Sequence, residues 1–289
     1  MISFRRILFP VDFSERCAAV APCVEAMVRR FGAELTVLHV VDLPPAAGIA
    51  PPEAAAWATL IGADQLRQSG KAALEHFVAR QFSVGIDLKA ETAEGSPAAT
   101  IVEFARERGA DLIMMPTAGA GPFRRLLLGS VTAKVLHDSG TPVWTGVHAD
   151  EMAAHPAGKW QRALCAVEDD PRDLPLLHWA AEFAHDQKLE VRLVHAVRGP
   201  EECEGNASFR EFLFNNAQER IGKLQAQAGT NFEVCLRLGE AGHAVHQAAF
   251  GHSADIVIIG RGVSQKAFGR FRSHAYEIIR EAPCPVISV

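Results

Sequence analysis

The chain repeats itself, and this internal repeat restricts the fold more than any other feature of the sequence. A short apolar run ends at Asp12 in the first half, and a matching run ends at Glu168 in the second half. In each half a histidine follows 27 residues later, His39 after Asp12 and His195 after Glu168. Correspondence over most of a chain of 289 residues indicates that one structural unit has been duplicated.

The first half alternates short apolar runs with longer helical patterns. The apolar runs lie at 6–11, 34–40, 86–91, 111–115 and 141–147, and the helical patterns lie at 14–31, 53–82, 97–108 and from 130 onward. The second half repeats this order, with the run 163–167 in the place of the first one. Because this alternation is typical of βαβ units, we predict parallel sheets with crossover helices.

The length also fits two domains, since an average domain has roughly 150 residues. We place the first domain at 1–149 and the second at 150–289. The junction falls in the segment 149–159, where a proline and a glycine are typical of a linker. The two halves differ mainly by an insertion near 43–58, which is rich in proline and alanine.

Charge, hydropathy and cysteine spacing exclude several classes of protein. The net charge is −5 and no basic run occurs, so we expect no nucleic-acid partner. Apolar stretches such as 35–41 fall far short of the roughly 20 residues that a membrane span needs, and the N-terminus lacks the apolar core of an export signal. The six cysteines show no zinc-site or redox spacing. We therefore expect a cytoplasmic protein that holds no metal and contacts no membrane.

The segment between the fourth apolar run and the next helix carries the strongest chemical signal. In open α/β sheets ligands bind beyond the carboxyl ends of the strands, which places residues 10–12 and 115–130 around one crevice. Gly119 and Gly121 allow close approach of the backbone. Gly129 and Ser130 open the following helix, whose start offers free N–H groups suited to phosphate. Ser130 either adds a hydroxyl to the ligand or caps that helix, and the spacing leaves both roles open.

Taken together, these motifs resemble the universal stress protein family. Residues 7–14 read Ile-Leu-Phe-Pro-Val-Asp-Phe-Ser, residues 38–42 read Leu-His-Val-Val-Asp, and the spacing Gly119-x9-Gly129-Ser130 follows the fourth run. Thr-Pro-Val at 141–143 and Cys-Pro-Val at 284–286 resemble the closing strand of the family. The resemblance covers nearly the whole chain. It implies two tandem Rossmann-like α/β domains of the adenine nucleotide alpha hydrolase-like type, each a five-stranded, mainly parallel sheet flanked by helices.

The resemblance also implies a site in the first half for ATP or another adenine nucleotide, with or without Mg²⁺. One set of residues lines the adenine and ribose end by this comparison: Pro10, Val11, Asp12, Val40 and Met115. A second set holds the phosphates through backbone N–H groups and a hydroxyl: Gly119, Gly129, Ser130 and Val131. The family further implies that the two domains pair within the chain, near Pro142 and Pro285, whereas a homodimer is a family trait that this sequence does not decide.

Pro116 stands where the family motif has its first glycine. Proline removes an N–H donor and fixes φ at about −65°. A lost hydrogen bond to a charged acceptor costs about 1.5–3 kcal/mol, which is about ten- to a hundredfold in affinity. The site in the first half then binds nucleotide more weakly, or it holds a different ligand.

The second half departs further from the motif. Val263 replaces the second glycine and Arg272 stands in the place of Gly129, whereas Ser273 remains. The acidic run 168–170 follows the first strand of this half and would repel a triphosphate if it faced the crevice. We therefore predict one nucleotide site, in the first half, and a vacant or altered second site.

No Ser/His/Asp, Cys/His or paired-carboxylate arrangement can be identified, so we do not predict an enzyme. His39 and His195 are interpreted as packing at strand ends, and His243 and His246 as packed or solvated side chains without a third metal ligand. The favoured function is a nucleotide-binding sensor or signalling protein of the stress response. The alternative is a tandem scaffold without nucleotide, which Pro116 and Arg272 favour, and a slow ATP hydrolase ranks third.

Overall fold

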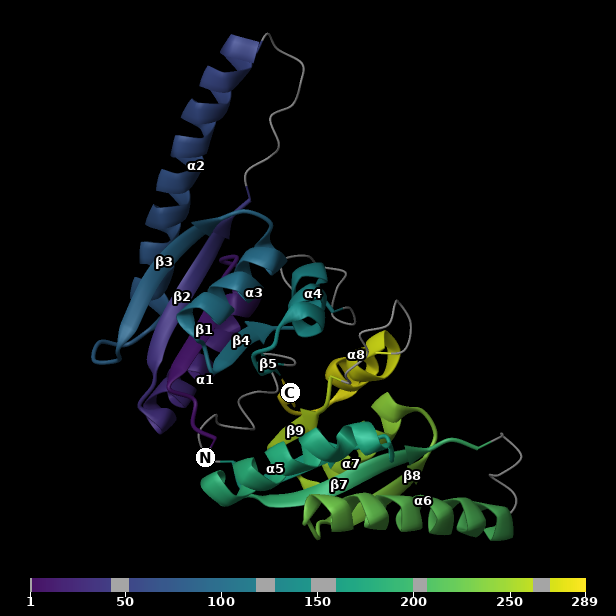
Figure 1. Cartoon of the computed structure of the whole chain (residues 1–289). Coiled ribbons are helices and arrows are strands. Elements are labelled where there is room, and N and C mark those ends of the chain that lie inside the picture. Colours follow the sequence, from purple (N-terminus) through teal and green to yellow (C-terminus); the bar gives the residue numbers. More distant parts are fainter. Residues whose placement is uncertain (1, 43–51, 118–127, 147–159, 200–206, 262–270) are drawn as a thin grey trace. The chain divides into compact units, whose positions relative to one another are not determined.

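The structure is a computed structural model of the chain. It describes residues 2–42, 52–117, 128–146, 160–199, 207–261 and 271–289, without the side chains of 52–61 and 271–273. Its contacts divide the chain into two compact units (Figure 1). The N-terminal unit comprises Phe4–Arg125 and Gly129–Thr141, and the C-terminal unit comprises Met1–Ser3, Leu126–Leu128 and Pro142–Val289.

The N-terminal unit contains a parallel sheet in the order β3-β2-β1-β4. Its strands are β1 (Arg6–Pro10), β2 (Glu34–Val41), β3 (Leu88–Glu94) and β4 (Leu112–Pro116). The two central strands are apolar and buried along nearly their whole length, because helices cover both faces of the sheet. The outer strand β3 alternates half-buried and exposed residues, as expected at a sheet edge.

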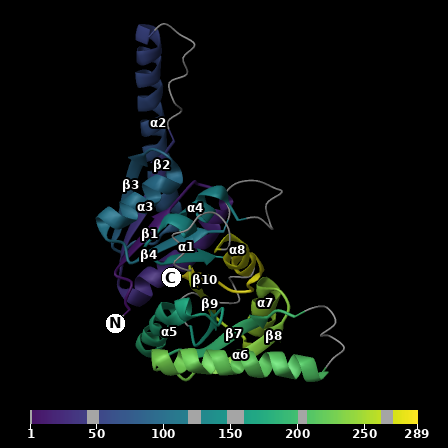
Figure 2. The same ribbon diagram turned by 45° about the vertical axis from the view of Figure 1, so that its right-hand side comes forward.

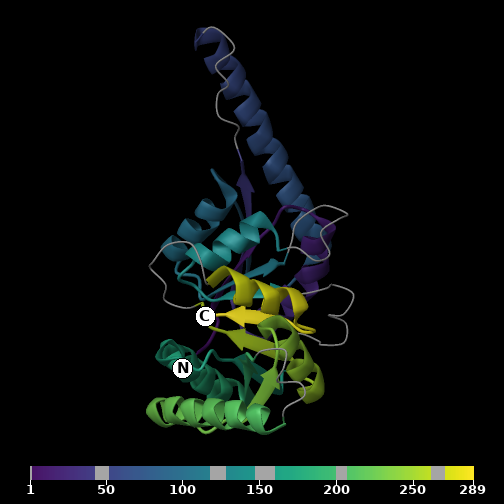
Figure 3. The ribbon, with the colours of Figure 1, turned by 90° about the vertical axis from the view of Figure 1, so that its right-hand side faces the viewer.

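Three helices connect these strands, namely α1 (Glu15–Phe31), α2 (Pro52–Gln81) and α3 (Pro97–Arg108), and a fourth helix, α4 (Ser130–Asp138), follows β4. The Ser14 hydroxyl accepts a hydrogen bond from the Cys17 N–H and caps α1, which ends at Gly32 with φ of 58°. In Figure 3, α2 continues well beyond the strands on which its C-terminal part packs.

The chain changes direction across the sheet between β1 and β4. It runs outward from β1 to β2 and β3, and then returns to the far side of β1 to form β4. Right-handed crossovers place α1 and α2 on one face and α3 and α4 on the other, so the connections after β1 and β4 diverge to opposite faces of the sheet.

The C-terminal unit repeats this topology in β8-β7-β6-β9 and adds two strands, β10 and β5. The order is β5-β10-β9-β6-β7-β8, in which β10 pairs antiparallel with β5 and all other pairs are parallel. The strands are β5 (Val143–Gly146), β6 (Arg162–Ala166), β7 (Glu190–Val197), β8 (Glu233–Leu238), β9 (Ile256–Ile259) and β10 (Val286–Ser288). The helices are α5 (Leu174–Gln187), preceded by a 3₁₀ turn at Pro171–Asp173, α6 (Ala207–Ala228), α7 (Ala241–His252) and α8 (Phe271–Glu281). Figure 2 shows α5 and α6 on one side of the strands and α7 and α8 on the other.

The predicted parallel α/β fold is confirmed, and most elements lie within one or two residues of their expected positions. The strand expected at 86–91 begins later, at Leu88, because its alternating charged residues give no sharp apolar boundary. The linker expected at 149–159 and the insertion at 43–58 lie mainly outside the described residues. Within the described part of the chain, no helix combines the length and apolarity needed to cross a membrane.

Candidate functional site

The turn after β1 forms one side of the candidate site. Pro10 and Val11 are buried, and the Val11 N–H donates to the Leu38 carbonyl at 2.8 Å, which continues the ladder with β2 past the end of β1. Asp12 follows directly, and Phe13 adopts φ of 60°. This left-handed residue turns the chain sharply into α1 and leaves Asp12 at the carboxyl end of the strand.

Asp12 is held by the start of α1. Its Oδ1 accepts hydrogen bonds from the Ser14 N–H and from the Cys17 thiol, both at 3.0 Å. Partial burial raises the pKa of this carboxyl group, but hydrogen bonds from Ser14 and Cys17 outweigh it and hold the pKa below its ordinary value. Burial raises the pKa of the Cys17 thiol to about 12, so the thiol keeps its proton and donates. Asp12 is therefore a fixed carboxylate at neutral pH.

His39 holds the end of β2 against the end of β1. Its Nδ1 lies 3.0 Å from the Val11 carbonyl oxygen, and because a carbonyl only accepts, Nδ1 carries the proton. The ring of Phe13 lies 4.3 Å from the His39 ring, centroid to centroid. The predicted role of His39 in packing at the strand end is confirmed. Val40, the next residue, is half-buried.

The end of β4 and the start of α4 are joined by two hydrogen bonds. The Thr132 hydroxyl donates to the Pro116 carbonyl at 3.0 Å, and the Gly129 N–H donates to the Thr117 carbonyl at 2.8 Å. Met115 is buried at the end of the same strand. Thr132 is not among the residues predicted from the sequence, although a hydroxyl in the first turn of a helix after a strand is a recognisable signal. Gly119 lies outside the described residues.

The N-terminus of α4 has no side-chain cap. Gly129 is the N-cap residue, with φ of −64° and ψ of 147°, and no side-chain hydrogen bond caps the helix. Ser130 is the first helical residue and is exposed, so of the two roles that the spacing left open, the structure excludes that of N-cap. The first N–H groups of a helix have no partner within the helix, and the helix dipole makes this end positive. The N–H groups of Ser130 and Val131 are thus suited to an anion.

The turn after β6 has the same backbone conformation as the turn after β1 but carries different side chains. His195 Nδ1 lies 2.9 Å from the Val167 carbonyl oxygen, which confirms the packing role predicted for His195. Asp169, with φ of 60°, occupies the position of Phe13. Its Oδ2 lies 2.6 Å from an Arg220 guanidinium nitrogen and 3.3 Å from His195 Nε2.

The acidic run after β6 is largely compensated. Asp170 pairs with Arg172 at 2.8 Å, in addition to the pair that Asp169 makes with Arg220. The Glu168 N–H donates to Asp173 Oδ2 at 2.6 Å, and burial raises the pKa of Asp173 to about 6. Part of the repulsion expected from residues 168–170 is therefore neutralised by arginine side chains.

Most of the second-half segment that corresponds to residues 116–130 lies outside the described residues. Gly260 follows β9, and a Cβ atom at this position would lie 3.4 Å from the Leu176 side chain. Val263 lies outside the described residues, and Arg272 and Ser273 belong to α8 with their side chains not described. The predicted vacancy of this site stays a prediction.

Comparison with known proteins agrees with the duplicated fold. The sequence model of the Universal stress protein family matches residues 3–145 and 159–289. Universal stress protein MJ0531 of Methanocaldococcus jannaschii is 33% identical over 140 residues, which are 48% of this chain and 80% of the relative. Universal stress protein MJ0577 of the same organism is 29% identical over 157 residues, which are 49% of this chain and 94% of the relative.

A solved structure shows the same fold over the whole length. The crystal structure of a universal stress protein from Archaeoglobus fulgidus aligns with a TM-score of 0.61 at 22% identity, and the alignment covers 100% of this chain and 97% of that chain. The family model matches twice, once in each half, in agreement with the repeat of strands and helices. The chain therefore belongs to the universal stress protein family and contains two tandem domains of that family.

Proposed function

We propose that the first half binds an adenine nucleotide, ATP or AMP, and that the protein is a cytoplasmic sensor or signalling protein of the stress response. The observation that supports this most is the uncapped N-terminus of α4, where Gly129 leaves the first N–H groups without a side-chain acceptor. These N–H groups follow β4, which lies next to β1 at the point where the strand order reverses. Ligands usually bind at this point in open α/β sheets.

The neighbouring strand ends supply the rest of the proposed pocket. Pro10, Val11, Val40 and Met115 offer apolar surface at the ends of β1, β2 and β4, which are adjacent strands. Asp12 offers an ionised carboxylate, a suitable acceptor for ribose hydroxyls. Gly119, Gly129, Ser130 and Val131 would contact the phosphates, and any Mg²⁺ would enter with ATP as its counterion.

Pro116 supports weak binding rather than a lost site. It lies inside β4 as its last residue, and its carbonyl accepts from the Thr132 hydroxyl. The N–H that proline lacks is one donor among several at this end of the sheet. We expect an affinity reduced by about ten- to a hundredfold relative to a glycine at this position, from about 1.5–3 kcal/mol for one charge-assisted hydrogen bond.

The test is calorimetric titration of the full chain with ATP and AMP, with the variant Gly129→Arg beside the wild type. We expect about a hundredfold loss of affinity in the variant, because at least two N–H contacts to phosphate worth about 1.5 kcal/mol each are lost. Gly140→Arg is the matched control, since it adds the same charge in the same unit where a Cβ meets nothing within 4 Å. Equal ATP affinity in all three proteins would contradict the proposed pocket.

The alternative is a tandem scaffold without nucleotide, which the proline at the start of the phosphate loop favours. Chromatography of the ligands released by heating the purified protein separates the two functions, because a scaffold would release no adenine nucleotide. A slow hydrolase would instead show metal-dependent phosphate release that disappears in Gly129→Arg.

We also propose that the chain forms two domains, 1–149 and 150–289, whose closing strands pair. The antiparallel ladder between β5 and β10 supports this proposal, with Thr145 opposite Val286 and Val143 opposite Ser288. Self-association into a homodimer remains a prediction, which sedimentation analysis would test.

A further inference from the structure

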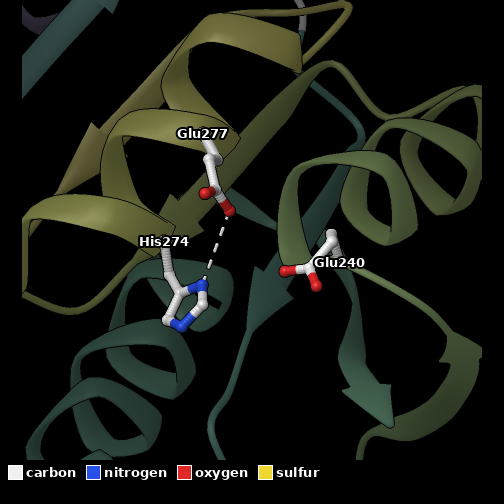
Figure 4. A group of neighbouring side chains, drawn as sticks. All are labelled: Glu240, His274 and Glu277. Atoms are coloured by element: carbon white, nitrogen blue, oxygen red, sulfur yellow. Dashed lines mark ion pairs between the residues drawn. The ribbon is translucent and has the colours of Figure 1, made fainter. Parts of the chain in front are cut away.

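Three side chains with metal-binding atoms converge in the C-terminal unit (Figure 4). Glu240 is the N-cap residue of α7 and directly follows the turn after β8, whereas His274 and Glu277 lie one turn apart on α8. The oxygen and nitrogen atoms that these side chains offer all lie within 4.8 Å of one another. We call this group, Glu240 with His274 and Glu277, the α7–α8 cluster.

One carboxylate oxygen of the cluster has no hydrogen-bond donor. Glu277 Oε2 is buried and has no hydrogen-bond partner among the described residues. The Nδ1 atom of His274 lies 3.5 Å from this oxygen, beyond the range of a strong hydrogen bond. A buried carboxylate oxygen without a donor is costly, and a cation would remove that cost.

Arg198 supplies the only arginine or lysine charge that is described at the cluster. Its guanidinium hydrogen-bonds to the His274 ring and lies 3.7 Å from Glu240 Oε2. The cluster and Arg198 together hold two carboxylates and one guanidinium, which leaves a net negative charge. Arg198 uses the same imidazole lone pair and the same carboxylate that a metal ion would use, so the two cations compete for one place.

We propose that the α7–α8 cluster binds a divalent transition-metal ion of the Zn²⁺ or Co²⁺ class, and that Arg198 leaves the cluster when the metal enters. One imidazole nitrogen and two carboxylate oxygens suit such ions, with water in the fourth position. Ligand atoms in a tetrahedral zinc site lie about 3.3 Å apart, given bonds of about 2.0–2.1 Å. The exposed side chain of Glu240 can close the remaining distance by rotation.

The first half lacks this donor set. Alignment of the repeats places Asp42, Ser96, Val131 and Lys134 at the positions of Arg198, Glu240, His274 and Glu277. Val131 and Lys134 offer no ligand to a metal ion, and Val131 lies where the first half is proposed to bind phosphate. The second copy has therefore exchanged an anion-binding helix start for a cluster suited to a cation. The metal proposal rests on the cluster alone and does not depend on nucleotide binding.

The test is titration of the metal-free full chain with Zn²⁺, followed by calorimetry, and with Co²⁺, followed by its visible absorption. We expect one site per chain that His274→Ala weakens by at least about tenfold, since one of three protein ligands is lost. Arg198→Ala should strengthen binding severalfold, because it removes the competing cation. A purely structural role would not produce these opposite effects.

Two further variants control the result. Glu277→Gln keeps the shape of the side chain, should also lose at least about tenfold in affinity, and guards against misfolding of His274→Ala. His243→Ala removes another histidine of α7, which contacts Gln247 rather than the cluster, and should bind as the wild type does. Equal Zn²⁺ affinity in the wild type, His274→Ala and Glu277→Gln, or weaker binding in Arg198→Ala, would overturn the proposal.

Discussion

The turn after β1 and the turn after β6 have the same backbone and different side chains. Each contains one left-handed residue, Phe13 or Asp169, both with φ of 60°. Each is tied to the next strand by a histidine Nδ1 bonded to a valine carbonyl, at 3.0 Å in the first half and 2.9 Å in the second. Both halves of the duplicated fold thus keep the hydrogen bond that joins the turn to the next strand.

The side chains of these two turns differ in polarity. Phe13 packs its ring against His39, whereas Asp169 forms ion pairs with His195 and Arg220. The first turn therefore presents apolar surface beside one carboxylate, and the second presents a network of charges. An adenine base suits the first environment better, which is the physical reason to expect different ligands in the two halves.

The largest effect is expected at Asp173, which occupies the position of Cys17. Burial raises the pKa of Asp173 to about 6, above the ordinary value of 3.8, so its charged form destabilises the folded state. Stability is lost as pH rises from about 4 to about 6, where the unfolded chain has released the proton and the folded chain still binds it. At neutral pH Asp173→Asn should stabilise the C-terminal unit by about 2–3 kcal/mol, at about 1.4 kcal/mol per pKa unit.

Chemical denaturation of Asp173→Asn and the wild type between pH 4 and pH 7 measures this. The asparagine oxygen can still accept from the Glu168 N–H, so this hydrogen bond of the turn is retained. Parallel stability curves for the two proteins over that range would show that Asp173 titrates normally, and the contrast with Cys17 would be lost.

A smaller effect is expected where α1 and α5 end. Gly32 and Lys188 hold equivalent positions and both adopt the left-handed conformation, with φ of 58° and 56°. A side chain in this conformation costs about 1 kcal/mol relative to glycine. Lys188→Gly should therefore stabilise the protein by about 1 kcal/mol, and Gly32→Lys should destabilise it by a similar amount. Thermal unfolding of both variants tests this prediction. Melting temperatures that shift in the same direction in the two variants would contradict it.

The smallest effect is expected at Asp12, and its sign is opposite to that at Asp173. The pKa of Asp12 lies below its ordinary value, so its charge stabilises the fold above about pH 4, and that stability is lost as pH falls through the lowered pKa. Asp12→Asn should destabilise the protein by up to about 1 kcal/mol at neutral pH, since hydrogen bonds to a charged acceptor become neutral ones. Urea titration at pH 7 measures it, and an unchanged or raised midpoint would contradict the assigned hydrogen bonds.

The elements that the sequence predicted best are those with a strong apolar signal. The runs at 6–11 and 111–115 correspond to β1 and β4, and the helix predicted at 97–108 has the same bounds as α3. The start of β3 was predicted two residues too early, at 86 instead of Leu88, because an edge strand carries few buried residues. Gly32 stands directly after the helical pattern at 14–31, where glycine is common, whereas the residue type of Lys188 gives no signal for the same left-handed position after α5.

The candidate sites were less predictable because they depend on tertiary structure. Ser130 fits the pattern of an N-cap, and only the backbone shows that Gly129 holds that position. Glu240 and His274 lie far apart in the chain, so no local spacing indicates that they meet. His243 and His246 were interpreted as packed or solvated histidines; both are exposed, and they contact Gln247 and the Glu281 carbonyl.

The ladder between β5 and β10 has a consequence for how the chain can be divided. Residues 143–146 come from the first sequence repeat, yet they cover the edge of the sheet formed by the second. A fragment beginning at residue 150 would expose the backbone of Val286 and Ile287, both now fully buried, along an open edge. Such an edge recruits strands from other molecules, so the separated half would aggregate, and a soluble fragment has to begin before Val143.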